Sequence, residues 1–212
     1  MWLRFVKDQT PEICLSAVKQ YGHALEYVEE QTFKICLAAV RQNGYALRYV
    51  KEQTEEICIA AVQQNSCVLQ FVKEQTEKIC LEIVKQNGCM LKFVKEQTEK
   101  ICLEAVNQSG WMLEYVKEQT EVICLAAVKK NGRSLPFVKI QTLKLCLEAV
   151  KQNGWALEYV KEQTPEICFA ALNKNPSCEK FIKIPFSFSM DFLLSIISSV
   201  GSVNCLSTTV LT

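Results

Sequence analysis

The chain has 212 residues, of which 49% are apolar and 22% charged, and its 24 lysines and arginines nearly balance 23 aspartates and glutamates. This composition is that of a folded protein, and a net charge of +1 argues against nucleic acid or an anionic membrane surface as the partner. The first ten residues show no basic segment followed by a long apolar run, so we expect no secretory signal and a cytoplasmic location. The 12 cysteines are therefore expected to be reduced.

The most informative feature of the sequence is an internal repeat of 22 residues. The dipeptide Gln-Thr recurs at this spacing from Gln9 to Thr164, and a cysteine follows each of these threonines by four residues. Glycine closes most of the units, and Ser66 and Pro176 stand at the corresponding position in the others. Such a register predicts a tandem array over residues 1–183.

Each unit is expected to begin with a helix capped by threonine. Thr54 stands where its hydroxyl can accept a backbone N–H of the first turn, and Pro11 and Pro165 occupy the first helical position of their units. Gly44, which follows the corresponding helix one unit earlier, is expected to take the left-handed conformation and turn the chain. A second amphipathic helix is then expected over residues 45–52.

Helices of this length are marginal on their own in water, so the units must stack to bury their apolar faces. We therefore predict an all-α fold, an α-solenoid of about eight 22-residue helix-turn-helix repeats. A leucine-rich repeat has a similar period, but the asparagine-anchored strand motif of that class is missing.

The composition changes after Ile184, so residues 184–212 are predicted to form a divergent, serine-rich, apolar tail. Residues 192–211 carry no charge and are long enough to cross a bilayer, which leaves a membrane-tethered structural protein as an alternative function. Their many serines and threonines make a poor membrane span, and a cap over the last repeat or an unrelated tail is favoured.

The regular cysteine column first suggests a metal or redox site, but its spacing provides no ligand pair, and buried cysteine behaves as a small apolar residue. We expect no metal and no cofactor. His23 is the single histidine, and no catalytic motif accompanies it, so we expect no enzyme. The glutamine of each Gln-Thr pair is expected to bridge backbone groups of neighbouring units, and Cys67 and Cys89, which lie outside the column, are the more reactive thiols.

The units differ mainly at two positions of the second helix, its first residue and the residue three positions later. These positions are neighbours on one helix face and form a surface that we call the variable strip. Its tryptophans, tyrosine and arginines are typical of interaction hot spots, which predicts a scaffold that binds an unknown protein partner; drift at unconstrained sites is the alternative. The candidate partner-binding residues are His23, Glu26, Tyr45, Arg48, Cys67, Gln70, Cys89, Lys92, Trp111, Glu114, Arg133, Trp155 and Glu158.

The repeated wording of the units, with "AVKQNG" followed by "AL-x-YV" as at residues 149–160, resembles the short helical repeats of the domain-of-unknown-function 4116 family. The resemblance covers residues 1–183 and implies a helical array without catalytic residues to carry over. That family occurs in bacteria and, as long near-identical arrays, in amoeba-infecting giant viruses. A viral source would imply the host cytoplasm as the location.

Overall fold

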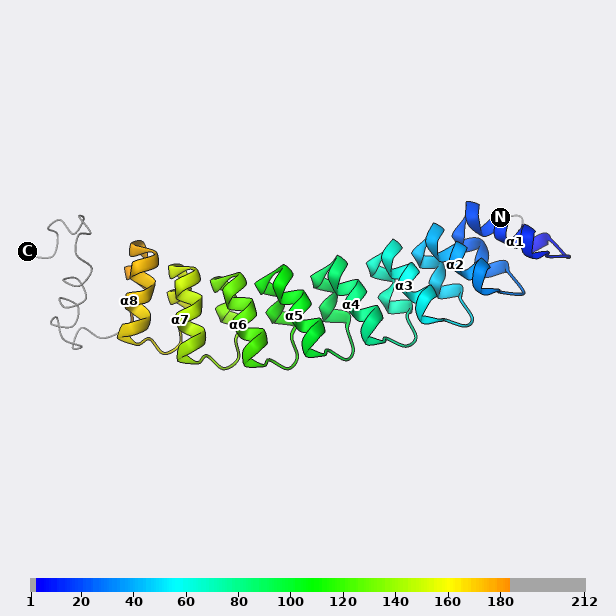
Figure 1. Cartoon of the computed structure of the whole chain (residues 1–212). Helices are drawn as coiled ribbons and strands as arrows, with labels where there is room; N and C mark the ends of the chain where they lie inside the picture. The colour runs from blue at the N-terminus through cyan, green and yellow to red at the C-terminus, as the bar shows by residue number, and fades with distance from the viewer. Residues whose placement is uncertain (1–2, 184–212) are drawn as a thin grey trace, which may run out of the picture.

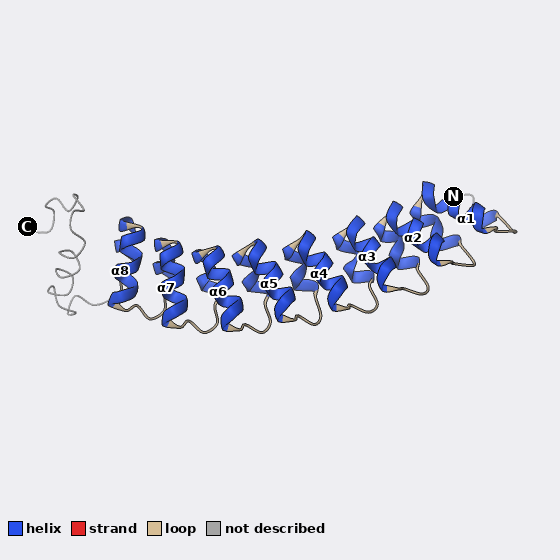
Figure 2. Ribbon diagram, viewed as in Figure 1, coloured by secondary structure: helices blue, strands red, loops and turns tan. Residues whose placement is uncertain are grey.

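The computed structural model describes residues 3–183, which form a gently curved row of short helices with α1 and α8 at opposite ends (Figure 1). Ten-residue α-helices alternate with short 3-10 helices, and the described residues contain no strand (Figure 2). The predicted all-α solenoid of eight 22-residue units is confirmed. The α-helices are α1 (Pro11–Gln20), α2 (Phe33–Gln42), α3 (Glu55–Gln64), α4 (Glu77–Gln86), α5 (Glu99–Gln108), α6 (Glu121–Lys130), α7 (Leu143–Gln152) and α8 (Pro165–Lys174). The 3-10 helices are η1 (Leu3–Phe5), η2 (Gly22–Tyr27), η3 (Gly44–Tyr49), η4 (Ser66–Phe71), η5 (Gly88–Phe93), η6 (Gly110–Tyr115), η7 (Gly132–Phe137), η8 (Gly154–Tyr159) and η9 (Pro176–Phe181).

Each unit consists of one α-helix and the 3-10 helix that follows it, and we number the units by their α-helices. Consecutive α-helices pack side by side in one layer, and consecutive 3-10 helices pack in a second layer against it. In unit 3, Ile57, Cys58 and Ala61 of α3 and Leu69 of η4 are buried between the layers. Because units 2 to 7 bury all of the corresponding residues and units 1 and 8 most of them, one apolar core runs through the described array.

The α-helices begin where the sequence predicts. The Oγ1 atom of Thr54 accepts the backbone N–H of Ile57 at 3.4 Å, which satisfies a donor of the first turn that has no partner within the helix. Pro11 and Pro165 lie at the first turn of their helices, where the missing N–H is not needed. The threonines that cap in this way are Thr10, Thr32, Thr54, Thr76, Thr98, Thr120, Thr142 and Thr164.

The expected left-handed turn at Gly44 is wrong. The chain leaves α2 through Asn43, which is extended with φ −152° and ψ 112°, and Gly44 is the first residue of η3. Glycine is required there for space, because a Cβ atom on Gly44 would lie 2.6 Å from the carbonyl oxygen of Ala61 in the next unit. The residue therefore permits close packing between units and does not serve as a helix stop.

The second helix of each unit is also shorter and tighter than expected. In unit 2 it is a 3-10 helix over Gly44–Tyr49, where the sequence predicts a helix over residues 45–52. Its last bond runs from the N–H of Val50 to the carbonyl of Leu47 at 3.1 Å, in the i to i+3 pattern. The next N–H, that of Lys51, donates to Oε1 of Gln31 at 3.0 Å, so the helix ends because a side chain outside the helix takes the donor.

The glutamine column joins each unit to the next, as predicted. Nε2 of Gln31 donates to the carbonyl of Leu25 in unit 1 at 3.4 Å and to that of Tyr49 in unit 2 at 2.9 Å, while its Oε1 accepts the N–H of Lys51. The same amide oxygen lies 3.7 Å from the thiol of Cys36. One amide thus pairs backbone groups that would otherwise be left without partners at the exit of the 3-10 helix.

The helices of the described region have at most ten residues, about half of what a bilayer crossing needs, so none of them can span a membrane. The segment 192–211, on which the membrane-tethered alternative depends, lies outside the described residues. The boundary predicted between residues 183 and 184 coincides with the end of the described residues, and the separate tail stays a prediction from composition.

Candidate interaction surface

The variable strip lies along the layer of 3-10 helices, with one pair of its residues on each helix from η2 to η8. The structure therefore brings the predicted residues together in a single row. Seven 3-10 helices, η2 to η8, carry the residues of the row in chain order. The two positions of the row differ in how much of the side chain is exposed. The second position of each pair is exposed at Glu26, Arg48, Gln70, Lys92, Glu114 and Glu158. The first position is exposed at Cys67, Cys89, Trp111 and Arg133 and half-buried at His23, Tyr45 and Trp155.

The half-burial has a cause that the sequence reading missed. The 3-10 helices η2 to η9 each end in tyrosine or phenylalanine, and rings of the variable strip pack edge-on against the ring that ends the next 3-10 helix. These contacts join residues of successive units and so cannot be deduced from the faces of one helix. The signal in the sequence that could have revealed them is the tyrosine or phenylalanine that recurs every 22 residues at the end of the second helix. The pairs are His23–Tyr49 at 5.7 Å between centroids, Tyr45–Phe71 at 6.0 Å, Trp111–Phe137 at 5.5 Å and Trp155–Phe181 at 5.7 Å.

Cationic side chains of the same surface lie over these rings. The guanidinium of Arg48 is 4.8 Å from the ring centroid of Phe71, and the ammonium of Lys92 is 4.8 Å from that of Phe93. Lys180 lies 5.0 Å from the Trp155 ring. The surface thus combines exposed aromatic edges with charges already positioned beside them, a composition that favours contact with another protein.

The cysteine column lies in the core. Cys58 is 2% exposed, and its thiol lies 3.7 Å from Oε1 of Gln53. Burial raises the pKa of Cys58 to about 11, and burial likewise raises the pKa of Cys168 to about 11. Such thiols stay protonated near neutral pH and are therefore poor nucleophiles. Cys67 and Cys89, in contrast, are exposed, in agreement with their predicted place outside the column.

Within residues 3–183, no three histidine, cysteine, aspartate or glutamate side chains come together in a way that could hold a metal ion. The cysteines of the column face the core one unit apart, each beside the glutamine of its own unit, as Cys36 is beside Gln31.

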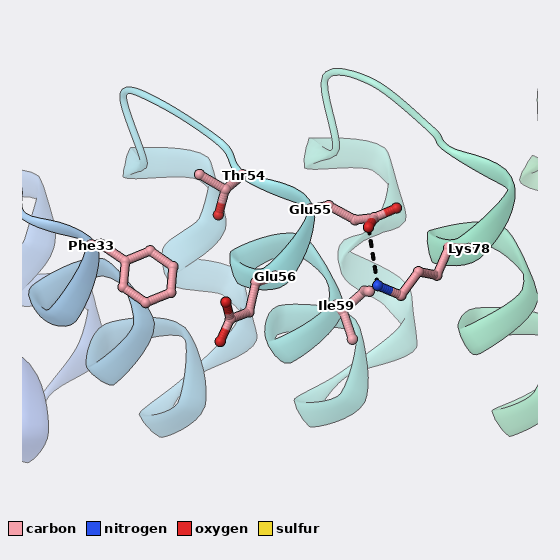
Figure 3. Close-up of a pocket in the computed structure, with 6 residues that line it drawn as sticks. All are labelled: Phe33, Thr54, Glu55, Glu56, Ile59 and Lys78. Atoms are coloured by element: carbon pink, nitrogen blue, oxygen red, sulfur yellow. Dashed lines mark hydrogen bonds and ion pairs between the residues drawn. The ribbon is translucent and has the colours of Figure 1, made fainter.

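A shallow hollow of about 640 Å³ lies on the opposite side of the array, across the N-terminal ends of α2, α3 and α4 (Figure 3). The ammonium of Lys78 reaches Oε2 of Glu55 at 3.1 Å, and the hydroxyl of Thr76 donates to Oε1 of the same carboxylate at 2.8 Å. The Thr76 hydroxyl and Lys78 hold the pKa of Glu55 below its usual range. A general acid needs the opposite shift, so Glu55 is a structural ion-pair partner. The hollow is lined by Phe33, Thr54, Glu55, Glu56, Ile59 and Lys78.

Comparison with known proteins gives one family. The sequence matches the family described as "Domain of unknown function (DUF4116)" over residues 10–54, 32–76, 54–99, 76–120 and 123–164. Each match spans about two of the 22-residue units, so the predicted resemblance is confirmed for the greater part of the array. No curated protein and no solved structure matches the chain.

Proposed function

The chain belongs to the family of the domain of unknown function DUF4116, and because that name carries no activity, we propose a function from the surface of the chain itself. The protein is a non-enzymatic helical-repeat scaffold, and it binds a protein partner along the variable strip. Its location is the cytoplasm, a proposal supported by the free, buried thiols of the column. A giant-virus source, with the host cytoplasm as location, is supported by the near-identity of the units.

The observation that carries the proposal is the contrast between the core and the variable strip. Leucine occupies the same buried position in units 1 to 7, from Leu25 to Leu157, because every unit must present the same face to its neighbours. At the first position of the variable strip the side chain changes from histidine to tyrosine, cysteine, tryptophan and arginine along the array. Stacking does not require this diversity, whereas recognition of one partner by a row of distinct side chains does.

The chemistry of the variable strip supports a protein partner more than a nucleic acid. Negative side chains at Glu26, Glu114 and Glu158 lie in the same row as the positive ones, so no basic stripe continues along the whole row for a phosphate backbone. Trp111 is 43% exposed although it already packs against Phe137, which leaves an indole face available for contact. Tryptophan and arginine are the residues that contribute most at protein interfaces.

The experiment is capture of partners on the immobilised full chain, with the captured proteins quantified by mass spectrometry. The variant Glu114→Lys/Glu158→Lys changes two exposed charges of the variable strip without touching the core. The matched control Lys100→Glu/Lys144→Glu changes two exposed charges on the α-helical side. We expect the partner to be lost, by about tenfold or more, only with the first variant. A partner set that is the same on wild-type protein and on both variants contradicts the proposal.

A further inference from the structure

The aromatic pairs along the variable strip are missing where its first position holds Cys67, Cys89 or Arg133, and the junction after Cys67, between units 3 and 4, differs most from the paired ones. In unit 2, Tyr45 covers one side of Phe71, which is half-buried. One unit later the position of Tyr45 is taken by Cys67, and the ring that ends the next 3-10 helix, Phe93, is 55% exposed. Cysteine is too small to cover a phenyl ring. Tyr115, which follows Cys89 in the same way, is nevertheless half-buried, so the exposure of Phe93 has a second cause in the spacing of units 3 and 4.

The close approach that glycine permits is also missing at this junction. In unit 2, the backbone of Gly44 lies so close to the carbonyl of Ala61 that a Cβ atom would not fit. One unit later these positions hold Ser66, which carries a Cβ atom, and Ile83, which is much larger than alanine. Both replacements add bulk at the tightest contact between units, so η4 cannot approach α4 as η3 approaches α3.

The hydrogen bonds at the junction reflect this wider spacing. The N–H of Gly44 donates to Oε1 of Gln64 at 2.7 Å, but among the described residues the corresponding pair, Ser66 and Gln86, makes no such bond. The bridging glutamine is affected as well, because Nε2 of Gln75 lies 3.5 Å from its carbonyl acceptor, where Gln53 is 2.9 Å from the corresponding one.

The α-helical side of the same junction remains joined. Glu55 of α3 accepts hydrogen bonds from the hydroxyl of Thr76 and the ammonium of Lys78, and Nε2 of Gln63 donates to Glu82 at 3.0 Å. The units are therefore held together at α3 and α4 while the contact between η4 and η5 is loosened. A side chain from outside can enter on the side of the variable strip without separating the units.

The charge around the open ring defines the chemistry of what enters. The second position of the variable strip holds Arg48, Gln70 and Lys92 in three successive units, so it carries no carboxylate there. The ammonium of Lys92 lies over one face of the exposed Phe93 ring, 4.8 Å from its centroid. An aromatic side chain could pack against the Phe93 ring, and aspartate or glutamate on either side of it could pair with the positive charges of the strip.

We propose that the partner inserts an aromatic side chain, carried by an acidic peptide segment, against Phe93 between η4 and η5. It takes the place that Tyr45, Trp111 and Trp155 occupy in their own junctions, in the same edge-on arrangement. The inference rests on the proposed function, since it names the chemistry by which the variable strip recognises its partner. The tyrosine and the two tryptophans at the corresponding position of the other units show which kind of side chain fits this place.

The test uses the full chain, isotope-labelled for NMR, and three synthetic acetylated pentapeptides. DDWDD carries the aromatic and acidic groups, DDLDD replaces the ring, and KKWKK reverses the charge. We expect DDWDD, at about millimolar concentration, to shift the signals of Cys67, Lys92 and Phe93, and the other two peptides to bind at least about fivefold more weakly. Equal binding of DDWDD and DDLDD, shifts confined to other units, or no shift at all would overturn the proposal.

Three variants test whether the binding is located at this junction. Cys67→Trp supplies the missing ring from within and should abolish DDWDD binding, while Cys89→Trp, the same change one unit later, should leave it intact. Lys92→Glu changes an exposed position, and it should weaken the binding of DDWDD and strengthen the binding of KKWKK. This variant tests the proposal even if Cys67→Trp does not fold. Undiminished DDWDD binding to folded Cys67→Trp would contradict the inference. Partner loss in the Glu114→Lys/Glu158→Lys variant without any DDWDD binding would reject this inference and keep the proposed function.

Discussion

The indole ring of Trp111 meets the phenyl ring of Phe137 at 69°, with the centroids 5.5 Å apart, although the two residues belong to successive units. The contact gives a residue of the variable strip two roles, because one part of the indole joins η6 to η7 while the rest faces solvent. The proposed recognition surface and the stacking of the units therefore share this residue, and changes at Trp111 are expected to affect both.

Replacing Trp111 with alanine should lower the stability of the array by about 1–2 kcal/mol, since an edge-on aromatic pair contributes beyond the area it buries. The neighbouring exposed residue gives the control, because Glu114→Ala should change stability by less than about 0.5 kcal/mol. Urea unfolding followed by circular dichroism measures both. Equal stability of the Trp111→Ala variant and wild type would show that the ring contact carries no energy.

Close packing at the glycine positions predicts a large effect of a single methyl group. A Cβ atom on Gly132 would clash with the carbonyl oxygen of Ala149, so Gly132→Ala must push η7 away from α7. We expect a loss of about 2 kcal/mol or more, as for other overpacked sites. The control is Ser134→Ala in the same 3-10 helix, whose cost is limited to the hydroxyl hydrogen bonds, and thermal unfolding distinguishes the two variants. A Gly132→Ala protein as stable as wild type would contradict the steric role of glycine.

The wider junction between units 3 and 4 should show in hydrogen exchange. The amide of Ser66 lacks the glutamine acceptor that Gly44 has, so it should exchange faster than the amide of Gly44. The double variant Ser66→Gly/Ile83→Ala restores both small residues and should slow exchange at position 66 toward that of Gly44. If the two amides exchange at the same rate in the wild-type protein, the junction is not loosened.

The bridging glutamine Gln53 should contribute more to the free energy of unfolding than an exposed glutamine does. Gln53→Ala removes the acceptor of the Lys73 N–H and the donor to the Phe71 carbonyl in one step. Leaving such groups unpaired should cost about 2 kcal/mol, compared with less than about 0.5 kcal/mol for Gln70→Ala on the exposed surface. Chemical unfolding of the two variants side by side tests this difference.

The buried thiols predict a pH dependence whose sign follows from their raised pKa. Cys58 titrates at about 11 in the folded chain and near 9 when unfolded, so between these values the unfolded state has lost a proton that the folded state keeps. Its contribution to stability is therefore complete below pH 9 and falls as pH rises from about 9 to 11. We expect the free energy of unfolding to fall less steeply with pH in Cys58→Ala than in the wild type over this range. Identical slopes of the free energy against pH would contradict the raised pKa of Cys58.

The sequence predicts those features that depend on one unit and fails for those that depend on two. Thr54 is recognisable as a cap because its acceptor role involves a residue three positions later. The left-handed turn expected at Gly44 was wrong, because the reason for glycine lies in the backbone at Ala61, a full helix away. The early end of η3 depends in the same way on Gln31, which lies before α2, a full helix away.

The same limit applies to the candidate site. The variable strip was predicted as a row, and the structure forms it, because i and i+3 positions are defined within one helix. The contact of Tyr45 with Phe71 was not predicted, since it depends on how far one unit is displaced along the next. Half-burial of Tyr45 and Trp155 therefore leaves Trp111 as the exposed aromatic residue of the variable strip, with the exposed ring of Phe93 beside the strip.

The most direct test of partner binding along the variable strip is site-specific photo-cross-linking. A benzophenone amino acid is placed at position 111 of the variable strip or, as the matched control, at Val122, which is 55% exposed on the side of the α-helices. If a partner binds along the variable strip, irradiation in a lysate should give one cross-linked protein from position 111 and none from position 122. The same cross-links from both positions, or from position 122 alone, would contradict it.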